Sequence, residues 1–319
     1  MSKYFIGIDT SNYTTSAAAA DGQGKIIASC KRLLPVKAGG VGLRQSEAVF
    51  SHVKQLSDIV SQLSRQIGGG ELAAVGYSAR PRDSEGSYLP CFVVGETVAR
   101  SIAAVNGVPS YGFSHQAGHI AAALYGSGAE HICGKDFFAF HVSGGTTELL
   151  GIDKNDGIEL LGGTLDINAG QLIDRVGVML GMQFPCGPEL EKAALRAVSG
   201  GAKLPGKPPV CVRGMHCNLS GIENKAKALI DSGVSYDTVA LYTIEAVTRT
   251  LEQLTQNAEA EFGKRPVLYA GGVTGCSLIR ERLTAGREAY FAPAEFSSDN
   301  AAGTALLCRR RHLSDISDM

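Results

Sequence analysis

Two histidines, His115 and His119, stand four residues apart at the start of the apolar stretch "GFSHQAGHIAAALYGSG". Four residues make about one helical turn, so a helix would place both imidazoles on the same face. Such a pair can ligate a metal ion, but histidines at this spacing also occur by chance and can equally be buried in a core. The pair by itself therefore leaves a metal site and a core role open.

Three turns could bind an anion through backbone N–H groups and small hydroxyl side chains. They span residues 7–12, 142–147 and 271–275, and each follows an expected strand. Such turns can cradle phosphates, although any single one can also be an ordinary hairpin turn. Three in one chain favour a nucleotide, with phosphates on the first two turns and the base or ribose near the third. The candidate contacts are Thr10, Ser11, Asn12, Val142, Ser143, Gly144, Gly145, Gly271 and Gly272.

Three acidic residues stand near helix starts, where a carboxylate can bind a ligand or simply stabilise the helix. Asp174 and Glu191 could hydrogen-bond ribose hydroxyls, or they could be solvated charges on a helix face. Asp299 precedes a helix of small residues, and a role as its N-cap explains it fully from the local sequence. A second role for Asp299 needs spatial evidence.

Bulk composition limits the classes of function. The chain has 319 residues, 44% of them hydrophobic, which predicts a soluble protein of about two domains. Basic and acidic residues number 30 and 31, so any RNA contact needs a local patch. The run Arg309–Arg311 could supply one, or could be a solvated helix end. Eight cysteines without a C-x-x-C pair, and no apolar signal-peptide core, predict reduced thiols and a cytoplasmic location.

The elements that must position these residues follow one pattern twice: a short β-meander and then helices. The pattern predicts an α/β fold of two lobes, each a mixed sheet flanked by helices, with a nucleotide cleft between them. We expect an N-terminal lobe of residues 1–130, against which a final helix of residues 300–319 packs, and a C-terminal lobe of residues 131–299. Expected strands cover 3–11, 14–21, 25–33, 71–79, 136–153 (two strands), 157–163, 265–273 and 289–293, and expected helices cover 46–67, 91–107, 112–128, 169–180, 188–199, 220–233, 236–262, 277–285 and 298–313.

Seven blocks in this order resemble the TsaD family of tRNA adenosine threonylcarbamoyltransferases, formerly described as glycoprotease-type metallopeptidases. The blocks are "GIDTS", "HQAGH", "HVSGGTTEL", the long segment "GGTLDINAGQLIDRVGVMLGMQFPCGPELEK", then "NLSGIENKA" with "AGGVTGCSLIRERL", and finally "SSDNAAGTA". The resemblance runs nearly end to end. It implies the two-lobed actin-like ATPase (ASKHA) fold of the actin, sugar kinase and heat-shock chaperone superfamily.

The resemblance also implies a reaction. A threonylcarbamoyl group would pass from threonylcarbamoyl-adenylate to N6 of adenosine in tRNA, with AMP leaving and one divalent metal, Fe or Zn, polarising the carbonyl. The cofactors implied are this metal and an adenine nucleotide, either ATP, AMP or the acyl-adenylate. The partners implied are the adenylate substrate, tRNA, and TsaB-like and TsaE-like proteins, with no membrane.

Individual residues take their implied roles from matching motif positions. The family's metal ligands fall on His115, His119 and Asp299. Some relatives carry an aromatic ligand directly before VSGG; here that position is His141, which we expect to be a fourth ligand. The phosphate-binding loop falls on residues 141–145. The ribose and adenine contacts fall on Asp174, Gly187, Glu191 and, in place of an asparagine, Cys276.

The departures from the family pattern cluster around the substrate. The sequence "RPRDSEGSYLPC" replaces a glycine-rich loop near the acyl group, and its Arg80 and Arg82 could bind a carboxylate or phosphate or be solvated. Tyr13 and Thr14 stand in place of an Asp-Glu pair, and Cys186 in place of a glycine. These changes predict a paralogue that keeps the metal and adenylate scaffold, with the acyl group or acceptor open to change.

Four alternatives compete with threonylcarbamoyl transfer. They are carbamoyl or related acyl transfer to another acceptor, ATP hydrolysis or phosphotransfer by analogy within the superfamily, metallopeptidase activity, and a non-catalytic nucleotide-binding role beside partner proteins. Peptidase chemistry is disfavoured because "HQAGH" lacks the glutamate of H-E-x-x-H. The intact set of His115, His119 and Asp299 argues against a purely non-catalytic role.

Overall fold

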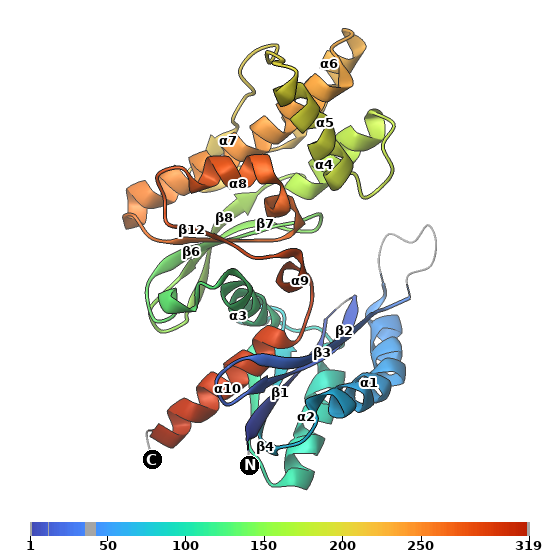
Figure 1. The fold of residues 1–319 in the computed structure, drawn as a ribbon, viewed down its shortest axis with the longest axis vertical. Coiled ribbons are helices and arrows are strands. Elements are labelled where there is room, and N and C mark those ends of the chain that lie inside the picture. Colours follow the sequence, from blue (N-terminus) through green and yellow to red (C-terminus); the bar gives the residue numbers. More distant parts are fainter. Residues whose placement is uncertain (1, 12, 36–42, 318–319) are drawn as a thin grey trace. The chain divides into compact units, whose positions relative to one another are not determined.

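The computed structural model describes residues 2–11, 13–35 and 43–317, and the chain divides into two compact units. The first unit comprises Met1–Gly126 and Glu295–Met319, and the second comprises Ser127–Ala294. Each unit contains one sheet flanked by helices (Figure 1). The segment from Glu295 onward, which includes Asp299, groups with the first unit.

The first unit is built on a mixed sheet in the order β3-β2-β1-β4-β5. β1 pairs antiparallel with β2 and parallel with β4, so the expected meander continues into parallel strands. Its residues alternate between faces: Ile6 and Ile8 pack in the core that α1 and α2 cover, whereas Phe5 packs against Cys308 of α10. The elements are β1 Lys3–Thr10, β2 Thr14–Asp21, β3 Ile26–Leu33, α1 Gln45–Ile67, β4 Glu71–Arg80, α2 Phe92–Asn106, β5 Ser110–Ser114, α3 His115–Ser127, α9 Ala294–Ser297 and α10 Ala302–Ser317.

Helix α10 approaches the sheet and α3 closely because glycines and alanines line the contact. A Cβ on Gly7 of β1 would overlap the backbone of Ala305. A Cβ on Gly303 of α10 would overlap the carbonyl of Gly118 on α3. Only glycine permits backbones to lie this near to one another. The close packing holds the start of α10 beside α3, which carries the histidine pair.

The second unit repeats the strand order of the first. Its sheet runs β12-β11-β6-β7-β8-β10-β9, so β8-β7-β6-β11-β12 corresponds to β3-β2-β1-β4-β5 with the same strand directions. A large core joins this sheet to the helices, with buried residues along α7. The elements are η1 Glu130–Ile132, β6 Phe137–Val142, β7 Thr147–Ile152, β8 Ile158–Thr164, α4 Ala169–Met179, α5 Gly187–Ser199, β9 Val212–Arg213, β10 His216–Cys217, α6 Ser220–Asp231, α7 Tyr236–Phe262, β11 Val267–Ala270, η2 Gly272–Gly275, α8 Ser277–Thr284 and β12 Ala289–Phe291.

Two expected helix starts are wrong. Residues 112–114 belong to β5, which extends the sheet through parallel pairing with β4, and α3 begins only at His115. The last helix begins at Ala302 and not at residue 298. The Ala302 N–H donates to the side-chain oxygen of Asn300, at 3.0 Å, so the N-cap role expected of Asp299 is also wrong. Within the described ranges, no helix is both long enough and apolar enough to span a membrane.

Candidate metal centre and nucleotide pocket

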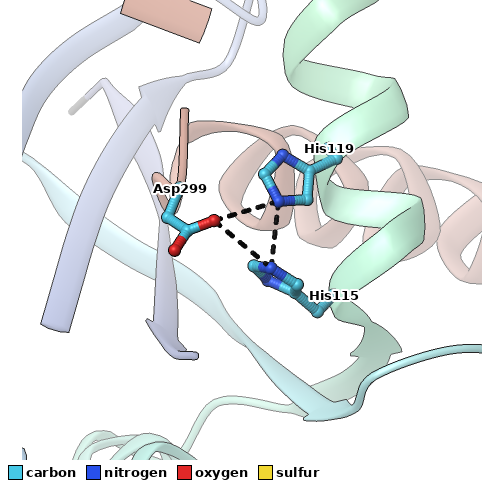
Figure 2. A group of neighbouring side chains, drawn as sticks. All are labelled: His115, His119 and Asp299. Atoms are coloured by element: carbon cyan, nitrogen blue, oxygen red, sulfur yellow. Dashed lines mark hydrogen bonds and ion pairs between the residues drawn. The ribbon is translucent and has the colours of Figure 1, made fainter. Parts of the chain in front are cut away.

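The histidine pair lies in the first turns of α3, directly after β5. The Ser114 hydroxyl accepts a hydrogen bond from the Ala117 N–H, at 3.1 Å, and donates one to Asp83, at 2.7 Å. A serine in this position satisfies a backbone donor at the helix start, which explains why the helix begins at His115. Figure 2 shows both imidazoles on the side of α3 that faces Asp299.

Three ligand atoms converge at this point. The Nε2 atoms of His115 and His119 are 2.9 Å apart. Oδ1 of Asp299 lies 3.2 Å from Nε2 of His119 and 3.6 Å from Nε2 of His115. Ligand atoms held at about 2.0–2.2 Å by one tetrahedral ion are roughly 3.3 Å from each other. Two imidazoles and one carboxylate at these separations therefore fit an iron or zinc ion with open coordination positions.

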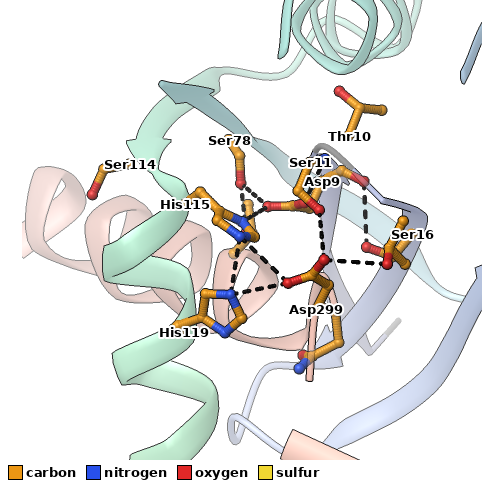
Figure 3. Close-up of polar contacts among 12 residues, drawn as sticks. Asp9, Thr10, Ser11, Ser16, Ser78, Ser114, His115, His119 and Asp299 are labelled. Atoms are coloured by element: carbon orange, nitrogen blue, oxygen red, sulfur yellow. Dashed lines mark hydrogen bonds and ion pairs between the residues drawn. The ribbon is translucent and has the colours of Figure 1, made fainter. Parts of the chain in front are cut away.

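A second layer of hydrogen bonds orients these ligands (Figure 3). Oδ2 of Asp9 lies 2.7 Å from Nδ1 of His115, and Asp9 also accepts a short hydrogen bond from the Ser78 hydroxyl. The hydroxyls of Ser11 and Thr14 donate to Oδ2 of Asp299, at 3.1 and 3.2 Å. The contacts to His115 and Asp299 use Nδ1 and Oδ2, so Nε2 of His115 and Oδ1 of Asp299 remain directed toward the place where a metal would lie.

The charges in this cluster stabilise one another. Burial acts to lower the pKa of His115, but the carboxylates of Asp9 and Asp299 outweigh burial and raise this pKa to about 10. Burial acts to raise the pKa of Asp299, but hydrogen bonds and charge from His115 and His119 hold it far below its ordinary value. Asp9 shows the same balance, with burial opposed by His115 and Ser78, and a net lowered pKa. A divalent ion would supply the positive charge that the protonated His115 supplies otherwise.

The first predicted nucleotide turn contributes to this cluster. The Ser11 side chain contacts Asp299, as described above. The Thr10 hydroxyl donates to the Cys91 carbonyl, at 2.9 Å, and accepts from the Gly95 N–H, at 3.1 Å, so it joins β1 to α2. Asn12 lies outside the described residues. A role of these three residues in nucleotide binding stays a prediction.

A cavity of about 410 Å³ in the second unit collects six of the predicted nucleotide residues. It is lined by the helix starts of α4 and α5 and by the segment after β11. Its lining includes Gly144, Asp174, Gly187, Glu191, Gly272 and Cys276. Helix N-termini and a glycine-rich loop at one cavity suit the phosphate and sugar of a nucleotide.

The carboxylates at this cavity are held in place by backbone donors. Asp174 accepts from the Cys186 N–H at 2.8 Å, and Glu191 accepts from the Ser277 N–H and hydroxyl at 2.7 and 2.6 Å. Burial first, and then the nearby Glu191, raises the pKa of the Cys276 thiol to about 11, so this thiol is neutral at ordinary pH. Cys276 therefore presents a small apolar surface to the cavity.

The loop between β6 and β7 is a tight turn closed by the Ser143 side chain, and its role in phosphate binding stays a prediction. The Ser143 hydroxyl accepts from the N–H groups of Gly145 and Thr146, at 3.2 and 3.1 Å. Gly271 has a φ of +103°, and a Cβ there would overlap the backbone of Val142. These contacts pack the predicted residues Val142, Ser143 and Gly271 against each other. His141 lies within strand β6 of the second unit, just before this loop. Its role as a fourth metal ligand stays a prediction.

Sequence reasoning missed three members of the metal cluster: Asp9, Thr14 and Ser78. Asp9 belongs to the block "GIDTS", and the signal in the sequence was a carboxylate directly after the apolar residues "FIGI". In the structure the Asp9 side chain is only 1% exposed. Ser78 and Thr14 gave no signal, because only the pairing of β1 with β2 and β4 brings their strands beside Asp9.

This chain is similar to a protein family and to several named proteins. Residues 32–306 match the family model of TsaD, tRNA N6-adenosine threonylcarbamoyltransferase. A Thermus thermophilus protein named tRNA N6-adenosine threonylcarbamoyltransferase is 32% identical over 97% of this chain and 93% of its own. A Thermoplasma acidophilum protein, named as a probable bifunctional tRNA threonylcarbamoyladenosine biosynthesis protein, is 29% identical over 92% of this chain. This chain spans about half of that relative, 54% of its length.

Solved structures show the fold. Component A of the (R)-2-hydroxyglutaryl-CoA dehydratase of Acidaminococcus fermentans matches 97% of this chain and 99% of its own, with a TM-score of 0.56 and 13% identity. The likeness confirms the predicted actin-like ATPase fold, with its two sheets and flanking helices. The family model covers most of the chain, and the described residues hold the predicted triad together. The chain belongs to the TsaD family of tRNA N6-adenosine threonylcarbamoyltransferases.

Proposed function

We propose that this protein transfers a threonylcarbamoyl group from threonylcarbamoyl-adenylate to N6 of an adenosine in tRNA. The observation that carries the proposal is the convergence of His115, His119 and Asp299 on one point, in a chain whose family is named for this reaction. These three residues would hold an iron or zinc ion. The ion would supply Lewis-acid polarisation of an acyl carbonyl.

In this proposal the adenylate occupies the cavity of the second unit. The phosphate lies at the loop of residues 141–145, and the ribose and base lie near Asp174, Gly187, Glu191 and Cys276. The Cys276 side chain would pack under the base, since a neutral thiol is a weak hydrogen-bond partner compared with an amide. His141 as a fourth metal ligand, and Thr10, Ser11, Asn12, Gly271 and Gly272 as further contacts, belong to the same proposal.

Partner proteins of the TsaB and TsaE type, and a cytoplasmic location, complete this proposal. The nearly balanced charge of the chain, −1 overall, supports tRNA binding that is assisted by a partner. The bifunctional name of the Thermoplasma acidophilum relative is consistent with additional functions joined to a chain of this kind.

A second function, transfer of a carbamoyl or related acyl group to a different acceptor, is favoured by the loop that follows β4. Arg80 forms an ion pair with Asp83 at 2.6 Å, and Asp83 accepts from Ser114 at the start of α3. The Pro81 carbonyl accepts from the Gln116 N–H, at 3.0 Å. This loop therefore rests on the helix turn that carries His115. Arginines beside a metal site can bind a carboxylate of the acyl group, so a changed loop can select a changed acyl group.

Nucleoside analysis tests the two functions together. The metal-loaded protein is incubated with tRNA and threonylcarbamoyl-adenylate, with and without TsaB-like and TsaE-like partners, and the digested tRNA is examined for modified adenosine. We expect modified adenosine from the wild type and from His131→Ala, a control histidine bonded to Tyr290 in the second unit, and none from His119→Ala. No product from the wild type, where the Thermus thermophilus relative modifies the same tRNA, would overturn threonylcarbamoyl transfer to tRNA as the function.

A further inference from the structure

We propose that Asp9 is the positioning residue that aims His115 at the metal. The inference rests on the proposed metal site but assigns a role outside the three ligands. Asp9 is the penultimate residue of β1 and is 1% exposed. It lies on the opposite side of the His115 ring from Asp299, with Nδ1 toward Asp9 and Nε2 toward Asp299 (Figure 3).

The carboxylate of Asp9 determines which nitrogen of His115 carries a proton. A carboxylate only accepts hydrogen bonds, so Nδ1 of His115 must be the donor in the 2.7 Å contact with Oδ2. When the ring is neutral, Nε2 therefore has the lone pair that a metal needs. A histidine ligand whose other nitrogen donates to a carboxylate is both oriented and made more basic.

Asp9 is itself fixed by two further donors from the sheet. Its Oδ1 accepts the Ser11 N–H at 3.0 Å, and its Oδ2 accepts the Ser78 hydroxyl. Ser78 lies on β4, which pairs parallel with β1, so these contacts belong to the sheet and not to α3. The direction of the His115 ring is thus set by a carboxylate on β1 that a hydroxyl on β4 helps to hold in place.

The exchange of Asp9 for asparagine tests the role because it keeps the shape and removes one acceptor. An amide has one accepting and one donating end, so it cannot accept from both Ser11 and His115. We expect Asp9→Asn to weaken zinc binding about 10- to 100-fold, measured by competition with a chelator of known affinity. Ser16→Ala is the matched control, since this buried hydroxyl of the same hairpin donates, among the described residues, only to the Asp9 backbone carbonyl. It should bind zinc as the wild type does.

A double-variant cycle separates positioning from a general structural effect. If Asp9 acts through His115, then Asp9→Asn has no additional effect on the weaker zinc affinity of His115→Ala. An equal fold-loss in both backgrounds would overturn the proposal, as would wild-type affinity in Asp9→Asn. If the wild-type chain binds no zinc, the metal site itself is wrong and the role of Asp9 falls with it.

A measurement on the zinc-loaded wild type keeps the proposal open to refutation even where Asp9→Asn does not fold. Nitrogen-15 spectra of labelled histidine should show His115 with a protonated Nδ1 and a metal-bound Nε2. Zinc on Nδ1, or an Nδ1 without a proton, would overturn the proposal whether or not tRNA is modified by the same sample.

Discussion

The residues of the candidate metal cluster in the first unit have two kinds of role, as proposed ligands and as hydrogen-bonding partners of those ligands. The ligand atoms of His115, His119 and Asp299 face one another, and the remaining atoms of His115 and Asp299 are bonded to Asp9, Ser11 and Thr14. This division explains how ionisable side chains can be buried without being left unpaired. It also explains why the spacing of the two histidines could not establish the site by itself. The histidines lie on α3, whereas the residues that hydrogen-bond to the cluster come from other elements.

Removal of a ligand should abolish metal binding more completely than removal of a supporting residue. His119→Ala and Asp299→Ala each delete one of the three converging atoms. We therefore expect each to lower the zinc affinity by more than about 100-fold, the upper end of the loss expected when a residue that only hydrogen-bonds to a ligand is changed. Metal content after dialysis, measured by elemental analysis, gives the result. Retention of stoichiometric zinc in either variant would contradict the assigned triad. His131→Ala should retain the metal, because its ring contacts Tyr290 in the second unit.

Secondary-structure elements bring these residues together through close packing. The glycine contact between α3 and α10 decides where Asp299 lies relative to the histidines, because Asp299 precedes α10 by only a short connection. The amphipathic and apolar patterns predicted most of these elements. The boundary between β5 and α3 was missed because no charged residue or proline separates "YGFS" from "HQAGH", and only pairing with β4 separates strand from helix.

A methyl group at Gly303 should destabilise the first unit. Its Cβ would overlap the backbone of Gly118 and come close to the Ala122 nitrogen, and backbone atoms cannot move aside as a flexible side chain can. We expect Gly303→Ala to cost about 1–3 kcal/mol and to lower the thermal midpoint by several degrees. Thermal unfolding followed by circular dichroism measures this. Gly221→Ala on α6, where a Cβ meets nothing within 4 Å, should be neutral or slightly stabilising.

Asp166, which follows β8, contacts the start of α6, and this contact should make the stability of the protein depend on pH in the acid range. Burial acts to raise the pKa of Asp166, but donors from the Leu219 N–H, from Ser220 and from the Ile167 N–H hold it well below its ordinary value. Because the folded pKa is lowered, the stabilisation is present above the unfolded value of about 3.9 and is lost as the pH falls toward the folded value.

The Asp166→Asn variant tests this sign. The difference in urea midpoint between wild type and variant should be largest at neutral pH and should shrink below about pH 4. A difference that stays constant over this range would show that the carboxylate charge is irrelevant. Asp231→Asn, at the other end of α6, is the control, and we expect it to leave the midpoint near that of the wild type at each pH.

At the scale of the whole molecule, the candidate metal site and the candidate nucleotide cavity belong to different units. All described members of the triad lie in the first unit, and all residues lining the 410 Å³ cavity lie in the second. The strand order is the same in the two units, and in each unit the end of the first strand, β1 or β6, lies near one of these groups of residues.

Hydrogen exchange should show this separation directly. Zinc stabilises the state that binds it, so it should slow amide exchange in α3 and in residues 296–303. AMP should instead slow exchange in residues 143–146 and at the starts of α4 and α5. Mass spectrometry of peptides gives both results. Protection of residues 139–143 by zinc alone would support His141 as a fourth ligand, whereas AMP protection confined to the first unit would contradict the assigned cavity.

The sequence by itself determined the fold class and the family, and it predicted which residues would be the metal ligands. Strand and helix periodicity is local, and the motif blocks are contiguous, so both can be read without coordinates. The tertiary structure alone decided that Asp299 faces the histidines instead of capping its helix, and that Asp9, Ser78 and Thr14 support the site. These residues are separated by up to 290 positions in the chain (Asp9 and Asp299) and meet only through strand pairing and helix packing. Contacts of this range leave no local pattern, because the geometry that creates them is a property of the assembled core.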